Sequence, residues 1–374
     1  MNVMVFHPGT QHSWQTATAL QQLGKLEFYA TSIFYKPDDW PYRIERYLPK
    51  QLRKRVQREF RRFEHEALDP HLVKTIGLFE WFERLASRAG SRELSIRLDQ
   101  IGNRHFSKLL EREIRSPKSF ALWGYNSSSL ESFELARELG RLCILDRTIG
   151  DWRYFNEVMQ AMSETHSEWF PSSYEAVDEY VIRRDDAEYE ASDVIVCGSK
   201  SCADTIRTHS PVEGIEKKLR VLPYCFDQAL FSGAARRTSG ARSGPVRFLF
   251  VGHLSMRKGI HHVLEAIAQI PCSEAELTLV GHMNIAPKVF ARYQDRINFI
   301  PTVPRSEIPR IMAQHDALVF PSYFEGSSLS LLEGLASGMA LIQTAQAGNG
   351  ATESTGILLE RPSTELTLAA MLTL

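Results

Sequence analysis

Residues 246–267 have the sequence VRFLFVGHLSMRKGIHHVLEAI, and this stretch decides the fold class. The apolar run VRFLFVG predicts a buried strand, and a short loop carrying glycine follows it. The loop leads into a predicted helix whose apolar face includes Ile260, Val263, Leu264 and Ile267. A strand that passes through a loop into a helix is the repeating unit of α/β proteins with parallel sheets.

The same alternation of short apolar runs and helical segments recurs along the whole chain. In the first part we predict strands at 3–6, 120–123, 142–146, 193–199 and 219–224, and a helix that begins near Trp14. In the second part we predict strands at 246–252, 275–281, 297–300, 317–322 and 340–344. Residues 232–245 are small, polar and basic, which is typical of a linker. The sequence therefore predicts two doubly wound domains, 1–231 and 246–374, joined by the linker 232–245.

The composition excludes several classes of protein. The 44 basic and 45 acidic residues nearly cancel, which argues against a dedicated nucleic-acid binder. The five cysteines form no C-x-x-C pair, so we expect small buried thiols in a reducing compartment and neither a disulfide framework nor a zinc site. The N-terminus MNVMVFHPGT lacks the features of a signal peptide, and no apolar run reaches ~18 residues. We predict a cytoplasmic globular protein.

Arg257 and Lys258 lie in the loop between the predicted strand and helix of 246–267. An Arg-Lys pair is usually solvated surface. At the N-terminus of a helix that follows a strand, however, the local backbone already favours anions. Arginine offers a planar fork to phosphate oxygens and lysine offers a compact charge, so together they could neutralise much of a diphosphate.

The stretch 320–338, FPSYFEGSSLSLLEGLASG, has the same strand-loop-helix order. We expect the backbone amides of Ser327, Ser328 and Leu329 to be unsatisfied donors at the start of the helix, where a phosphate could bind. Glu333, one to two turns into the helix, could accept hydrogen bonds from two ribose hydroxyls, and Glu325 would lie closer to the group attached to the phosphates. The alternative is that both glutamates are ordinary turn and helix residues.

In combination, these motifs resemble family 4 glycosyltransferases of the GT-B fold. The pattern E-x7-E, formed by Glu325 and Glu333, follows VGHLSMRKG, LTLVG and INFIPTVPRSEI in the family's order. The resemblance covers most of 215–345 and extends more weakly to RRDDAEYEASDVIVCGS (183–199). In the interdomain segment LRVLPYCFDQALF, Cys225 replaces the usual glycine.

The resemblance implies a role for each matching position. Arg257 and Lys258 match residues that hold the donor diphosphate, and Glu333 matches the glutamate that binds the nucleotide ribose. Further positions match the donor-facing loops, the backbone contact to the base, and the loop of the first domain that lines the donor and acceptor cleft. They are Gly252, His253, Glu325, Gly326, Ser327, Ser328, Leu329, the turn Thr302-Val303, and the segment His7 to His12 with Pro8 and Gly9.

Three departures from the family pattern are present. His253 stands where arginine is usual, Ser327-Ser328 replaces a common Phe-Gly, and the chain ends at Leu374, where family members continue through further helices. The resemblance therefore implies a second domain that is shortened at its C-terminus.

The resemblance also implies transfer with retention of configuration and no obligatory metal or other cofactor. The sequence has no D-x-D triplet, so Arg257, Lys258 and a helix N-terminus would stabilise the leaving diphosphate. The implied donor is a nucleotide-diphosphate-sugar, and the implied acceptor is a glycan, a lipid-linked molecule or a small molecule, as in polysaccharide biosynthesis. A catalytic histidine is expected in the first domain. His7, His12, His105 and His166 compete for the role, and location favours His7 or His12.

Residues 43–63, RIERYLPKQLRKRVQREFRRF, carry nine basic residues and two acidic ones. Leu48, Leu52, Val56, Phe60 and Phe63 recur at helical spacing, so the segment predicts a basic amphipathic helix. Such a helix could lie on an anionic membrane and make the protein peripheral to it. The alternative is that its apolar stripe packs on the first domain while its charges stay in solvent.

Two other functions fit the sequence. The first is a GT-B enzyme of another class, such as a nucleotide-sugar epimerase, which would change the sugar without releasing nucleoside diphosphate. The second is a catalytically silent nucleotide-sugar-binding protein, which would bind the nucleotide without sugar turnover.

Overall fold

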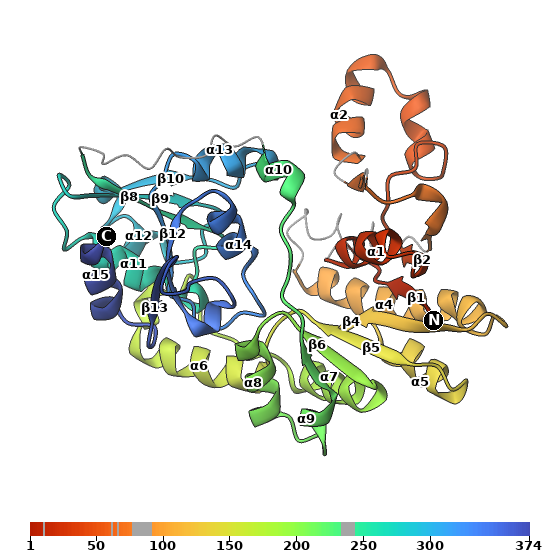
Figure 1. Cartoon of the computed structure of the whole chain (residues 1–374). Helices are drawn as coiled ribbons and strands as arrows, with labels where there is room; N and C mark the ends of the chain where they lie inside the picture. Colours follow the sequence, from red (N-terminus) through yellow and green to blue (C-terminus); the bar gives the residue numbers. More distant parts are fainter. Residues whose placement is uncertain (10–11, 61–62, 66, 77–91, 233–243) are drawn as a thin grey trace. The chain divides into compact units, whose positions relative to one another are not determined.

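The computed structural model describes residues 1–374 except 10–11, 61–62, 66, 77–91 and 233–243. The chain divides into two compact units (Figure 1). Unit 1 comprises Met1–Asp146, Arg183–Val196 and Val212–Lys218, and unit 2 comprises Arg147–Ile182, Cys197–Pro211 and Leu219–Leu374. The predicted boundary at the linker 232–245 stays a prediction, because most of that segment lies outside the described residues.

The first sheet has seven strands in the order β3-β2-β1-β4-β5-β6-β7. The strands are β1 (Asn2–Phe6), β2 (Leu26–Thr31), β3 (Val73–Thr75), β4 (Phe120–Tyr125), β5 (Cys143–Arg147), β6 (Val194–Cys197) and β7 (Leu219–Val221). The described α-helices of this part of the chain are α1 (Ser13–Gln22), α2 (Lys50–Phe60), α4 (Arg92–Ile114), α5 (Leu130–Glu138), α6 (Trp152–Thr165), α7 (Glu179–Ala191), α8 (Lys200–His209), α9 (Ile215–Lys218) and α10 (Gln228–Ser232).

The second sheet has six strands in the order β10-β9-β8-β11-β12-β13. Its strands are β8 (Val246–Val251), β9 (Ala275–Val280), β10 (Ile297–Ile300), β11 (Ala317–Phe320), β12 (Ala340–Thr344) and β13 (Gly356–Leu359). The accompanying α-helices are α11 (Ile260–Ile267), α12 (Pro287–Phe290), α13 (Ile308–Met312), α14 (Leu329–Ala336) and α15 (Thr364–Thr373). The described pairs within both sheets are parallel, for example β1 with β4 and β8 with β11.

The two parallel sheets and their helices confirm the predicted α/β class with two doubly wound, Rossmann-like sheets. The apolar face predicted for α11 is correct, because Ile260, Val263, Leu264 and Ile267 are all fully buried. They pack in one core with β8 and with Met159, Met162 and Trp169 from the segment 147–182. The strand order reverses between β8 and β11, which places the loops after these strands at a topological switch point, where ligands of open α/β sheets bind.

The cysteines and the basic segment correct two expectations. All five cysteines are thiols, but Cys225 and Cys272 are exposed, so the prediction of buried thiols is right only for Cys143, Cys197 and Cys202. The single helix predicted over 43–63 is wrong. The segment forms a 3-10 helix, η1 (Tyr42–Tyr47), and then α2 from Lys50. Pro49 separates them, because proline cannot continue a helix that has already begun.

Candidate functional site

The loops after β8 and β11 bind each other through backbone hydrogen bonds. The amide of Tyr323 donates to the carbonyl of Arg257 (2.9 Å), and Ser322 Oγ donates to the same carbonyl (3.2 Å). Arg257 and Lys258 belong to a 3-10 helix, η5 (Met256–Lys258), which ends at Gly259 in the left-handed conformation (φ 69°). The basic pair is therefore fixed against the loop that carries Glu325.

Arg257, Lys258 and Glu325 form one ion-paired cluster, which we call the charge triad. Arg257 Nη1 lies 2.9 Å from Glu325 Oε1, and Lys258 Nζ lies 2.6 Å from the same oxygen. Arg257 Nη1 also donates to the carbonyl of Phe324 (2.5 Å). Lys258 Nζ lies 4.6 Å from the centre of the Phe320 ring. The sequence predicted these three residues for one site, and the structure brings them together.

The neighbouring cations favour the ionised form of Glu325. Burial alone would raise the pKa of Glu325, but Lys258 and Arg257 outweigh it and hold that pKa below its ordinary value. Burial lowers the pKa of Lys258, and Glu325 beside it acts in the opposite direction. A carboxylate with a depressed pKa cannot serve as a proton donor near neutral pH. In this structure the Glu325 carboxylate holds the two cations by its charge.

Two glycines let these loops approach closely. A Cβ atom on Gly259 would lie 2.0 Å from the carbonyl oxygen of Pro321, and a Cβ on Gly326 would lie 2.0 Å from the carbonyl oxygen of Thr148. Ser199, the N-cap of α8, donates its hydroxyl to the Gly326 carbonyl (2.5 Å). The segments 147–182 and 197–211 thus support the Glu325 loop within unit 2.

The start of α14 offers backbone donors, as predicted, but not all of those expected. The amide of Ser328 donates to the carbonyl of Ala347 (2.9 Å), so the expectation that it is unsatisfied is wrong. Within the described part of the chain, the amides of Gly326, Ser327 and Leu329 donate to no protein acceptor. The remaining donors lie directly after Glu325 and can bind an anion.

Glu333 is buried in α14, and its carboxylate pairs with an arginine that the sequence analysis did not single out. Arg305 Nη2 lies 3.1 Å from Glu333 Oε1. The pKa of Glu333 is raised above its ordinary value. Burial is the main cause and Asp227 adds to it, while Arg305 acts in the opposite direction. Arg305 lies in the motif INFIPTVPRSEI, but nothing in the sequence shows that it reaches α14.

The other predicted donor residues of unit 2 lie at the ends of β8 and β10. Gly252 directly follows β8. Burial, then Lys258 and His282, lower the pKa of the neighbouring His253, so its ring is neutral near neutral pH and adds no fixed positive charge. Thr302 is exposed and Val303 is half-buried in the loop after β10.

In unit 1, the predicted residues His7, Pro8 and Gly9 follow β1. His7 is buried, and its Nδ1 accepts a hydrogen bond from the amide of Gly9 (3.0 Å). In its neutral form the ring therefore carries its proton on Nε2. His12 is half-buried, and its carbonyl accepts the amide hydrogens of the first turn of α1. Of the competing histidines, His105 is exposed in α4, whereas His166 lies in unit 2 beside His261 (5.1 Å between ring centres).

A family model described as "Glycosyl transferases group 1" matches residues 245–374. This part of the chain matches that family, and we call it the group 1 domain. It contains β8 to β13 and the whole charge triad.

Similar proteins agree with this assignment. The glycogen synthase of Mycobacterium tuberculosis is 26% identical over 198 residues, which cover 50% of this chain and 44% of that protein. The chain thus spans less than half the length of this curated relative.

Among solved structures, the sucrose-phosphate synthase of Thermosynechococcus elongatus has a TM-score of 0.60 at 16% identity, and the match covers 100% of this chain and 89% of that one. HepE of Anabaena, solved in complex with UDP-glucose, has a TM-score of 0.54 at 11% identity with the same coverages. The predicted GT-B fold is confirmed.

The group 1 domain contains a second polar network, which sequence reasoning missed. Tyr323, two residues before Glu325, shares a hydrogen bond with His262 Nε2 (2.7 Å), and His262 Nδ1 shares one with Thr364 Oγ1 (2.8 Å). Thr364 Oγ1 in turn donates to Glu265 Oε2 (2.5 Å). The chain of hydrogen bonds ties the Glu325 loop to α11 and α15. The HH pair of the motif RKGIHH was the only signal for it.

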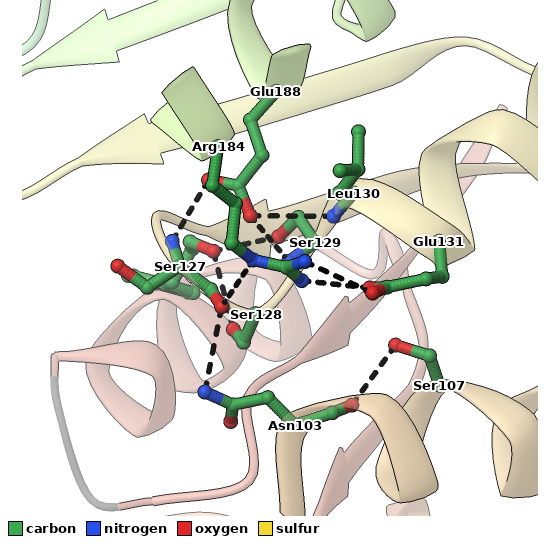
Figure 2. A network of polar contacts seen from close by, with 10 residues as sticks. Asn103, Ser107, Ser127, Ser128, Ser129, Leu130, Glu131, Arg184 and Glu188 are labelled. Atoms are coloured by element: carbon green, nitrogen blue, oxygen red, sulfur yellow. Dashed lines mark hydrogen bonds and ion pairs between the residues drawn. The ribbon is translucent and has the colours of Figure 1, made fainter. Parts of the chain in front are cut away.

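Outside the group 1 domain, one helix N-terminus of unit 1 is filled by a carboxylate of the protein itself (Figure 2). Glu188 of α7 accepts the amides of Ser127 (2.8 Å), Ser129 (2.9 Å) and Leu130 (3.2 Å) at the start of α5. Burial raises the pKa of Glu188 to about 7, and Asp185 also raises it. Arg184 pairs with Glu131 (2.7 Å) beside it. The loop after β4 therefore does not offer these three amides to a ligand phosphate.

The described residues contain no group of three or more His, Cys, Asp or Glu side chains that could hold a metal ion. No helix among them is long and apolar enough to cross a membrane.

Proposed function

We propose that the protein is a retaining glycosyltransferase that moves a sugar from a nucleotide-diphosphate-sugar to a glycan, a lipid-linked acceptor or a small molecule. The observation that carries the proposal is the charge triad at the β8/β11 switch point of the group 1 domain. The solved complex of HepE with UDP-glucose supports a donor of this class.

The triad carries a net positive charge, because two cations share one carboxylate. A diphosphate placed at the free amides of Gly326, Ser327 and Leu329 would meet both the helix N-terminus and the two cations. As the bond between the sugar and the diphosphate breaks, negative charge grows on the leaving phosphate, and donors fixed before the reaction stabilise it. The attacking acceptor hydroxyl loses its proton, and on the same-face route the leaving phosphate oxygen accepts it. Glu325 keeps Arg257 and Lys258 in place for this step.

We also propose that the reaction needs no metal ion, since Arg257 and Lys258 supply positive charge at the diphosphate. The rate of nucleoside diphosphate release should be unchanged by EDTA. A loss of activity with EDTA that added Mg²⁺ or Mn²⁺ restores would contradict this proposal.

The donor can be identified with a thermal-shift panel of UDP-, GDP- and ADP-sugars. A ligand at 100 times its dissociation constant stabilises the folded state by about 2.7 kcal/mol. Product analysis with the donor that binds then tests the function. A transferase releases nucleoside diphosphate in step with a glycosylated acceptor, an epimerase changes the sugar without release, and a silent protein binds without turnover. Either of the last two outcomes would overturn the proposal.

Replacing Glu333 with alanine should weaken donor binding about tenfold or more. Two ribose hydroxyls would lose a charged acceptor, and hydrogen bonds to charged groups contribute roughly 1.5–3 kcal/mol. Isothermal titration with the nucleoside diphosphate of the donor measures the change. Glu307→Ala is the matched control, because Glu307 is a partly exposed glutamate that pairs weakly with Arg310 (3.9 Å). Equal affinities of the two variants would remove Glu333 from the site.

For the acceptor side we propose that His7 or His12 of unit 1 binds the reacting groups. Their position after β1 supports this, because β1 and β4 flank the switch point of the first sheet. If one of them acts on the substrate, its replacement by glutamine should lower the rate of transfer while donor affinity stays the same. Donor affinity is measured separately, by the titration used for Glu333.

We propose further that the segment from Trp40 to Lys54 binds an anionic membrane surface. Trp40, Tyr47 and Leu52 are 66%, 75% and 52% exposed, and basic residues surround them. The alternative in which the apolar stripe packs inward holds only for part of it, since Phe60 contacts the buried Tyr42 ring edge-on (4.9 Å) while Leu52 stays exposed. In Figure 1, α2 stands apart from the first sheet. Exposed aromatic rings beside lysine and arginine are typical of interfacial binding.

Replacing Arg43, Lys50 and Lys54 with glutamine should abolish co-sedimentation with vesicles that contain phosphatidylglycerol. Each basic residue near such a surface contributes about 1 kcal/mol, so three should lower the affinity about a hundredfold at modest salt. The matched control changes three exposed basic residues of unit 1 outside the segment, Lys25, Lys108 and Arg112. Absent or salt-insensitive binding by the parent protein would rule the membrane proposal out and leave the transferase proposal standing.

A further inference from the structure

Unit 2 contains a cavity of about 740 Å³ that the proposed reaction does not use. It lies between α8 and the loop after β12, and Tyr154 of α6 also lines it. Its volume is in the range of small-molecule sites, roughly 300–1,000 Å³. The charge triad and Glu333 do not line this cavity.

The charges in the wall compensate each other. Lys200 Nζ pairs with Asp204 Oδ2 (2.6 Å), and Arg207, which does not line the cavity, pairs with the other oxygen of Asp204. Burial would raise the pKa of Asp204, but Lys200 and Arg207 outweigh it and hold the pKa below its ordinary value. The wall therefore presents no excess charge, which disfavours a phosphate or any other strongly charged ligand.

The neutral polar groups of the wall fall into two sets. Gln343 is fully used by the protein, because its Nε2 donates to the carbonyl of Gly348 (2.8 Å) and its Oε1 accepts the amide of Ala351 (2.8 Å). Gln346 is different, since its Oε1 is shielded from water and accepts no hydrogen bond from the described residues. An acceptor left in this state costs roughly 1–3 kcal/mol, so a rotation of the half-buried Gln346 side chain that lets a ligand hydroxyl donate to Oε1 would be favourable.

Other groups that line the cavity add donors, acceptors and an aromatic face. Asn349 Nδ2 donates a hydrogen bond to the carbonyl of Gly198 (3.1 Å). Its Oδ1 accepts no hydrogen bond from the described residues. The half-buried rings of Tyr154 and His209 lie 5.3 Å apart, and both line the cavity. Hydroxyl groups of Ser201, Thr208 and Thr352 complete the wall. A pocket with unused amide acceptors, hydroxyls, an aromatic face and no excess charge suits a ligand that carries many hydroxyls and no charge.

We propose that this cavity binds a neutral saccharide. The site is separate from the donor site and does not depend on the transfer reaction. Two contacts nevertheless connect the wall to the Glu325 loop. The amide of Ser328 donates to the carbonyl of Ala347, and the ring centres of Tyr154 and Phe324 lie 6.1 Å apart.

The test is saturation-transfer NMR and titration calorimetry of the full chain, with the donor site filled by whichever of UDP, GDP and ADP gives the largest thermal shift. The neutral probes are glucose, galactose, N-acetylglucosamine and maltotriose, and inorganic phosphate is the anionic probe. We expect saturable binding of at least one neutral probe with a Kd of about 1 mM or tighter. Gln346→Leu should raise that Kd about fivefold, the expected loss of one neutral hydrogen bond.

A second variant locates the ligand. Ala345 is exposed and lines the cavity, so Ala345→Phe should fill the space and abolish binding, whereas Ala291→Phe, an exposed alanine elsewhere in unit 2, should leave it unchanged. Circular dichroism checks that each variant is folded. No binding of any neutral probe, tighter binding of phosphate, or unchanged saccharide binding in both Ala345→Phe and Gln346→Leu would overturn the proposal.

Discussion

Replacing Lys258 with methionine is expected to lower the rate of sugar transfer about a hundred- to a thousandfold. Nζ of Lys258 is buried against Glu325 (2.6 Å), so its charge is fixed where a leaving diphosphate would develop negative charge. Loss of one such preorganised group typically costs that much in rate. Initial rates of nucleoside diphosphate release measure the effect, and Lys288→Met, at an exposed lysine of the same domain, is the control. Rates of Lys258→Met within about twofold of the parent would remove Lys258 from the mechanism.

The same substitution also changes stability, so the two effects need to be separated. Removing one partner of a buried ion pair costs about 3–5 kcal/mol, but Arg257 still faces Glu325 in this variant and should reduce the loss. Chemical denaturation measures the loss of stability, and rates are then compared per folded molecule, so a rate that stays low reports the missing charge. A rate per folded molecule equal to that of the parent would mean that Lys258 acts only through the fold.

The pH dependence of stability gives an independent check on the triad. The pKa of Glu325 is lowered in the folded state, so its contribution is present above its unfolded value of about 4.3 and is lost as the pH falls through the folded value. Replacing Glu325 with glutamine should flatten this acid limb of the stability curve. An unchanged acid limb would mean that Glu325 does not contribute to it.

Replacing Gly259 with alanine is expected to destabilise the protein by about 3 kcal/mol or more, the largest stability loss we predict. The left-handed backbone alone costs roughly 1–2 kcal/mol with a Cβ present. The new Cβ would also lie 2.0 Å from the carbonyl oxygen of Pro321, so the β8 and β11 loops would have to separate. Chemical denaturation measures the loss, and donor affinity should fall with it.

Gly338 provides the matched control for this prediction. It has a similar backbone conformation (φ 74°) in the same unit, but a Cβ there would meet no atom within 4 Å. Gly338→Ala should therefore cost only the conformational part, roughly 1–2 kcal/mol. If the two variants lose equal free energy of unfolding, the close packing of Gly259 on Pro321 does not contribute to stability.

Five of the six described strands of the second sheet could be predicted from sequence to within about two residues. The predictions 297–300 and 340–344 coincide with β10 and β12, and 246–252 and 275–281 end one residue beyond β8 and β9. Strands buried on both faces appear as continuous apolar runs bounded by glycine, which makes them easy to recognise. The strands β2, β3 and β13 were missed. β3 contains only Val-Lys-Thr, which is too short to show any periodicity.

The site could be predicted where its residues come from local motifs, but not where distant segments meet. The positions of Arg257, Lys258 and Glu325 followed from strand-loop-helix units. The contact of Arg305 with Glu333 could not be predicted, because it forms only when α14 packs against the loop after β10. The hydrogen bond from the Ser328 amide to the Ala347 carbonyl likewise joins two segments that are separate in sequence. The functions proposed for the individual residues remain predictions.

The chain contributes to its two units in an interleaved order, and this affects how the group 1 domain can be produced. Residues 147–182 and 197–211 belong to unit 2 although they precede Val246 by many residues. Met159, Met162 and Trp169 are part of the same apolar core as β8 and α11. A recombinant fragment that starts at Val246 would expose the core surface that these side chains cover, and it would lack Ser199, which holds the Gly326 carbonyl. During synthesis, residues 147–182 and 197–211 can complete this core only after β8 to β13 have been made, so unit 2 cannot finish folding before Leu359 has been synthesised.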